Sequence, residues 1–95
     1  MSLKFEWDRK KAASNLSKHH VPFEVALTAF GDPLARIFDD EDYSIKEQRE
    51  IIIGHSVKRR LLVVCFTAQE DSVRIFSARK TTRRERKDYE ENTKS

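Results

Sequence analysis

Glycine and cysteine are scarce in this chain of 95 residues, and their scarcity excludes several classes of enzyme. The two glycines, Gly31 and Gly54, lie far apart, so the chain has no glycine-rich loop for phosphates or dinucleotides. The single cysteine, Cys65, excludes an intrachain disulfide, and no cysteine–histidine spacing typical of zinc sites occurs. Cys65 stands within the apolar run 61–66, where we expect a buried, inert thiol. The sequence therefore predicts no cofactor and no bound metal.

Long apolar segments are also missing. No apolar run approaches the roughly 20 residues that a membrane-spanning helix needs, and no signal peptide is recognisable. This predicts a soluble, cytoplasmic protein with no membrane partner. The length predicts a single domain over residues 1–95, in which residues 92–95 form a frayed tail. Charged residues make up 37% of the chain, against roughly 25% in an average domain, so we expect one modest core under a highly charged surface.

Charge is abundant, and it is unevenly distributed. Four consecutive acidic residues occupy positions 39–42, whereas positions 79–87 hold six arginines and lysines with Glu85 as the one acidic residue among them. The net charge is +3 and the pI is near 9.2. Clustered arginine in a basic chain indicates a polyanion as the binding partner. The alternative is that these cations form a solvated helix face.

Hydrophobic periodicity predicts an α+β fold in the order β-α-α-β-β-β-β-α. We expect strands at 3–7, 34–38, 48–55, 61–67 and 73–79, and helices at 9–19, 22–30 and 82–90. Pro22 and Gly31 bound the second helix, and Thr82 with Glu85 forms a capping box for the last one. Short connections between successive strands favour an antiparallel sheet of four to five strands. The two N-terminal helices are expected to cover its apolar face.

The residue types present in this chain are suited to the cleavage of RNA. The 2′-hydroxyl of RNA can attack the adjacent phosphate, so the protein need supply neither a nucleophile nor a metal. Arginine suits the remaining task, because its planar guanidinium binds two phosphate oxygens and stays charged. Arg79 and Arg74, on the last predicted strand, are the first candidates. Their spacing of five residues predicts that the two side chains point to opposite faces of the sheet.

Other residues are candidates for proton transfer or for organising the site. His55 ends a central strand beside Gly54 and is the candidate general acid or base. Glu47 and Arg49 are two residues apart, hence on one face, and could organise the site as a pair. His19 ends the first helix, where a helix cap or a packing residue is favoured over a base. Solvated surface charge is the alternative for the candidate RNA-binding residues, which are Lys58, Arg60, Lys80, Arg83, Arg86 and Tyr89.

The order of these residues along the chain resembles that of the BrnT-type toxins. The opening Lys4-Phe5-Glu6-Trp7-Asp8 and the segment Arg74-Ile75-Phe76-Ser77-Ala78-Arg79-Lys80 carry most of the resemblance, which extends from residue 4 to about residue 90. It implies a RelE/ParE-like fold and a ribonuclease that blocks translation. It also implies a BrnA-type antitoxin with a ribbon-helix-helix DNA-binding domain. Two toxins would join an antitoxin dimer in a heterotetramer, which binds its own promoter DNA through the antitoxin.

Two positions depart from the family pattern, and two other functions fit the same arginines. Pro22 stands where the family often has serine, and His20 where glycine is common, but neither lies near the basic end of the chain. A non-catalytic nucleic-acid or partner-binding module would use the same cations. A ParE-like gyrase poison would also fit, since one fold can serve different targets. Only the ribonuclease predicts strand scission without a metal.

Overall fold

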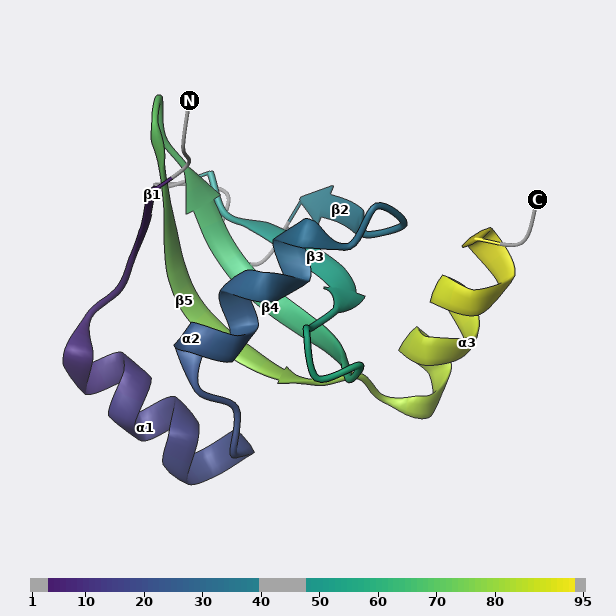
Figure 1. The fold of residues 1–95 in the computed structure, drawn as a ribbon, viewed down its shortest axis with the longest axis horizontal. Helices are drawn as coiled ribbons and strands as arrows, with labels where there is room; N and C mark the ends of the chain where they lie inside the picture. Colours follow the sequence, from purple (N-terminus) through teal and green to yellow (C-terminus); the bar gives the residue numbers. More distant parts are fainter. Residues whose placement is uncertain (1–3, 40–47, 94–95) are drawn as a thin grey trace.

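The computed structural model describes residues 4–39 and 48–93 (Figure 1). The elements follow in the order β1 (Lys4–Glu6), α1 (Arg9–His19), α2 (Phe23–Ala26), the 3-10 helix η1 (Leu27–Gly31), β2 (Arg36–Asp39), β3 (Glu50–His55), β4 (Leu61–Ala68), β5 (Ser72–Lys80) and α3 (Arg83–Thr93). The predicted α+β class and element order are confirmed, although the second predicted helix is 3-10 in its second half. None of the helices described is long and apolar enough to cross a membrane.

The five strands form one sheet in the order β1-β5-β4-β3-β2. Strands β2 to β5 pair in antiparallel fashion with their neighbours, as their short connections predict. Strand β1 instead pairs in parallel with the start of β5, where Phe5 lies opposite Val73. The sheet is therefore mixed. Short connections do not predict how β1 and β5 pair, because most of the chain separates these two strands.

One face of the sheet carries the hydrophobic core. Figure 1 shows α2 crossing in front of the sheet, while α1 lies beside β5 and α3 extends from the opposite side. Phe23 of α2 and Ala29 of η1 are fully buried against the sheet. The strand residues that share this core face are Ile52, Leu62, Val64, Phe66, Val73, Ile75 and Ala78. The predicted packing of the N-terminal helices on the sheet is thus observed, with α2 and η1 covering the apolar face and α1 packing at the edge of β5.

A β-bulge in β5 decides which side chains reach the other face. Cys65 pairs with Ser77 but Phe66 pairs with Ile75, so Phe76 is an extra residue in β5. The extra residue shifts the in–out alternation, and Arg79 and Arg74 fall on the same face of the sheet, away from the core. The prediction that they point to opposite faces was wrong, because counting by twos holds only along an unbroken strand.

A buried asparagine fixes α1 to the edge of β5. The Asn15 side chain is 5% exposed, and its amide nitrogen donates to the carbonyls of Val21 and Ala78, at 3.0 and 2.8 Å. Its oxygen accepts from the N–H of Ala78 at 3.0 Å. Strand β1 pairs only with residues 72–74. Asn15 therefore supplies Ala78 with the backbone hydrogen bonds that a neighbouring strand would otherwise provide. This contact sets the position of the whole helix beside the sheet.

Candidate nucleic-acid interface

The sheet face opposite the core forms an open groove with α1, with a volume of about 490 Å³. Strand residues Ile51, Val63 and Cys65 line its floor. The cationic or titratable residues that line it are Lys11, Lys18, His19, Arg49 and Arg79. Among the described residues that line the groove, none is a carboxylate. A hollow lined by one sign of charge concentrates counter-ions, so this geometry suits a polyanion.

Arg79 is held at the end of the groove by the first turn of α3. Its two terminal nitrogens donate to the two carboxylate oxygens of Glu85, both at 2.8 Å. The hydrogen bond to Glu85 raises the pKa of Arg79 above its usual value. The same bond from Arg79 lowers the pKa of Glu85 to about 2, against the opposing effect of burial. Glu85 also accepts from the N–H of Thr82, which completes the predicted capping box.

Phe76 and Arg49 meet inside the same groove. The guanidinium carbon of Arg49 lies 4.0 Å from the centroid of the Phe76 ring. From the α1 side, the Lys11 ammonium lies over the same ring at 4.9 Å. Cations over an aromatic face are attracted by its quadrupole. The bulge thus places an aromatic ring between cations of the two walls of the groove.

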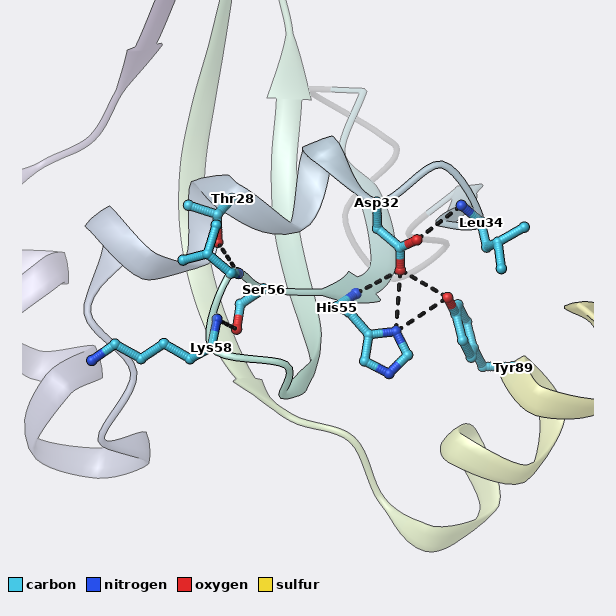
Figure 2. A network of polar contacts seen from close by, with 8 residues as sticks. Thr28, Asp32, Leu34, His55, Ser56, Lys58 and Tyr89 are labelled. Carbon is cyan, nitrogen blue, oxygen red and sulfur yellow. Dashed lines mark hydrogen bonds and ion pairs between the residues drawn. The ribbon is translucent and has the colours of Figure 1, made fainter.

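A second polar arrangement, here called the Asp32 cluster, consists of Asp32, His55 and Tyr89 (Figure 2). Asp32 follows η1 and accepts from the backbone N–H of His55 at 2.7 Å and of Leu34 at 2.9 Å. The Tyr89 hydroxyl of α3 donates to the same carboxylate at 2.7 Å. Burial raises the pKa of Asp32, but these hydrogen bonds outweigh it and lower the pKa to about 2. Burial, followed by the bond to Asp32, raises the pKa of Tyr89 to about 12.

His55 completes the Asp32 cluster. Its Nδ1 lies 3.3 Å from both the Asp32 carboxylate and the Tyr89 hydroxyl, and Figure 2 shows all three side chains converging on one point. The imidazole packs edge-to-face on the Tyr89 ring, with centroids 5.3 Å apart. Tyr89 is 4% exposed. The cluster therefore joins the end of η1, the end of β3 and helix α3.

The structure brings together two of the five predicted catalytic residues. Arg49 and Arg79 line the groove, whereas His55 is not among its lining residues. Arg74 lies at the other end of β5, 3.7 Å from the carboxylate of Glu6, and both side chains are half-exposed. Glu47 falls outside the described residues.

The predicted RNA-binding residues are dispersed. Lys58 and Arg60 line a small pocket of about 120 Å³ at the turn between β3 and β4. Tyr89 is buried in the Asp32 cluster. The others are exposed at the end of β5 or on α3, and they are Lys80, Arg83 and Arg86.

Sequence reasoning did not assign Lys11 and Lys18 to a site, and it favoured a cap or packing role for His19. A signal for the lysines was present, because residues 11, 14 and 18 follow the spacing i, i+3, i+7 of one helix face. This signal is weak, because lysines on a helix usually form a solvated face. Nothing in the spacing indicated that this face borders the sheet.

The fold and the groove define a small α+β domain with one strongly cationic surface. The chain belongs to the family of ribonuclease toxins, BrnT, of type II toxin–antitoxin systems, whose model matches residues 7–85. It is also similar in fold to the crystal structure of the Brucella abortus ribonuclease toxin, BrnT. That similarity has a TM-score of 0.62 and 23% sequence identity, over 86% of this chain and 100% of the Brucella chain. No curated protein sequence matches this chain.

Family membership confirms the resemblance seen in the sequence. The chain is a toxin of a type II toxin–antitoxin system, with ribonuclease as the activity of its family. The family accordingly implies an RNA target and an antitoxin partner.

Proposed function

We propose that this chain is a metal-independent endoribonuclease that inhibits translation, and that the groove between α1 and the sheet holds the RNA. The observation that carries the proposal is the convergence of Lys11, Lys18, Arg49 and Arg79 on one open groove. Four cations from two walls match a phosphodiester backbone. The fold brings them together from helix α1, from the residue that precedes β3 and from the bulged strand β5.

The reaction we propose uses the nucleophile of the RNA itself. The 2′-oxygen attacks the adjacent phosphorus, the bond from phosphorus to the 5′-oxygen breaks, and a 2′,3′-cyclic phosphate remains. One proton leaves the 2′-hydroxyl and one reaches the departing 5′-oxygen. Arg79 and Arg49 stabilise the charge that develops on the phosphate oxygens.

His19 is the groove residue suited to move a proton, because histidine is the side chain that most often serves as a general acid or base. His55, the acid–base candidate from the sequence, is bonded within the Asp32 cluster outside the groove. We assign His55 an architectural role. Arg74, beside Glu6 and away from the groove, receives no catalytic role in this proposal.

We further propose that a BrnA-type antitoxin with a ribbon-helix-helix domain neutralises the toxin in the cytoplasm. An acidic segment of the antitoxin covering the groove would compete directly with RNA. Two toxins and an antitoxin dimer would form a heterotetramer that binds promoter DNA through the antitoxin. The basic groove supports an acidic partner, and the affinity of such a complex should fall as salt rises.

The deciding experiment is cleavage of purified RNA by the isolated protein in EDTA, with Arg79→Ala as the comparison. Scission by the wild type alone, with 2′,3′-cyclic phosphate ends, is the expected result. Intact RNA would count against the proposal. Growth arrest without RNA scission, together with inhibited DNA supercoiling, would favour the gyrase poison. Binding without scission or growth arrest would favour a non-catalytic module.

A further inference from the structure

The bulged residue of β5 is aromatic, and it faces the groove rather than the core. Phe76 has no partner in the register of β4, and it lines the groove with Lys11 and Arg49. Four of the other five phenylalanines lie in the core or pack against it, and Phe30 contacts both Phe5 and Phe66. Phe38 of β2 is 45% exposed. Phe76 does not belong to the described core cluster. Burial in the core therefore does not account for an aromatic side chain at this position.

The surroundings of the Phe76 ring are those of a stacking surface. At 4.0 Å, the guanidinium of Arg49 is in van der Waals contact with the ring face. The Lys11 ammonium approaches the ring from α1 at 4.9 Å. Aromatic rings and guanidinium planes are the two protein surfaces on which unpaired bases stack. Both are present here, within the groove that carries the phosphate-binding cations.

We propose that Phe76 and Arg49 form a subsite for one unpaired nucleobase, which makes the groove selective for single-stranded RNA. This inference rests on the proposed function. A base entering the groove stacks against the pair, and Lys11, a point charge on a flexible stem, moves from the ring to a neighbouring phosphate. A base within a duplex is stacked on both faces, so it cannot use the subsite without unpairing.

The test measures the binding of single-stranded 2′-O-methyl RNA, which lacks the attacking hydroxyl. A series of otherwise identical oligonucleotides carries one abasic residue at successive positions. We expect the wild type to lose roughly 5- to 150-fold in affinity at one position, the range expected for one stacked base. Phe76→Leu should bind the intact oligonucleotide as weakly as the wild type binds the oligonucleotide that is abasic at the sensitive position. The abasic residue should cause no further loss of affinity in Phe76→Leu. Wild-type affinity of Phe76→Leu, or undiminished sensitivity to the abasic residue, would overturn the subsite.

Two variants keep the test decisive if Phe76→Leu does not fold. Phe76→Trp retains an aromatic face, and it should keep both the affinity and the abasic-sensitive position. Arg49→Lys keeps the charge but removes the planar guanidinium. This variant should bind intact RNA more weakly than the wild type does, and the difference between the two proteins should be smaller for the abasic oligonucleotide. Failure of either expectation would count against the subsite.

The outcomes also separate this inference from the proposed function. Arg79→Ala should weaken intact and abasic RNA by the same factor, because its contact is with phosphate. A wild type that cuts RNA but has no abasic-sensitive position overturns the subsite and leaves the ribonuclease standing. A wild type that neither binds nor cuts RNA overturns both.

Discussion

The groove and the Asp32 cluster both gather polar side chains from distant parts of the chain, but they differ in how charge is compensated. In the Asp32 cluster, one buried carboxylate accepts bonds from two backbone amides and the Tyr89 hydroxyl. In the groove, side chains of one charge sign converge on an open surface. Like charges held together oppose folding and favour the binding of an anion. The contrast supports the proposal that the cluster is architectural and that the groove holds the ligand.

The largest effect is expected on RNA cleavage, and two single variants, one in each region, should show it by comparison. Arg79→Ala should reduce RNA cleavage by about 100- to 1000-fold, the range for losing one donor to a developing oxyanion. Its stability should change little, since Arg79 is partly exposed and its ion pair with Glu85 lies near the surface. His55→Ala should lower stability and leave the cleavage rate of folded protein unchanged. The measurements are cleavage rates and urea unfolding of both variants.

A matched control for charge lies on the same strand. Arg74 shares the sheet face with Arg79 but lies near β1, beside Glu6. Arg74→Ala should cleave RNA at close to the wild-type rate. If His55→Ala or Arg74→Ala lost activity as fully as Arg79→Ala while remaining folded, the division between the two regions would be wrong.

Acid should destabilise the protein through the Asp32 cluster. The pKa of Asp32 is about 2 in the folded protein, against a usual value of 3.8. A carboxyl whose pKa is depressed by folding stabilises the fold above its unfolded pKa, and that contribution disappears as pH falls through the folded pKa. We expect a loss of about 2 kcal/mol from this group between pH 5 and pH 2. The free energy of unfolding by urea, measured across that range, gives the comparison.

The acid effect has its own control. Asp32→Asn should be less stable at neutral pH, because an amide presents a donor to groups that are themselves donors. Its stability should then fall less steeply below pH 5 than that of the wild type. Glu85 remains in this variant and contributes a further acid-dependent loss, since its pKa is also near 2. Identical pH profiles for the two proteins would show that Asp32 does not hold its charge as described.

An effect on stability of similar size is expected from the Tyr89 hydroxyl, which connects α3 to Asp32. Tyr89→Phe keeps the buried ring and removes the 2.7 Å hydrogen bond to Asp32. The bond joins a neutral donor to a charged acceptor, so its loss should lower the free energy of unfolding by about 1.5–3 kcal/mol. RNA binding by the folded variant should be unchanged. In Tyr89→Phe, amide hydrogen exchange should accelerate more in α3 than in β4. Equal acceleration in both elements would argue against the hydrogen bond stabilising α3 locally.

The element order was predictable because it depends on local information. Alternation and helical spacing identify the strands and helices, and Thr82 with Glu85 marks the start of α3 within three residues of sequence. The groove was predictable only in part. Arg79 and Arg49 follow from the chemistry of phosphate, whereas the lysines of α1 join them only once Asn15 has fixed that helix beside β5.

The remaining features depend on contacts between distant residues. The bulge at Phe76 is defined by the pairing of β5 with β4, so counting along β5 alone cannot detect it. Asp32 lies 23 residues from His55 and 57 from Tyr89. The local sequence Asp32-Pro33 indicates a turn, and the 2.9 Å bond to the Leu34 amide agrees with it. No local pattern indicates the other two partners.

The smallest effect should come from Glu85, which occupies the guanidinium of Arg79 that a phosphate would use. Glu85→Gln removes the competing charge while a side-chain oxygen remains for the amide of Thr82, since glutamine also serves in a capping box. RNA affinity should rise a few-fold at low salt, with the gain shrinking as salt screens the charges. Fluorescence anisotropy with uncleavable RNA at several salt concentrations measures this. A fall in affinity instead would mean that Glu85 orients Arg79 for phosphate rather than competing with it, and the carboxylate would then belong to the groove.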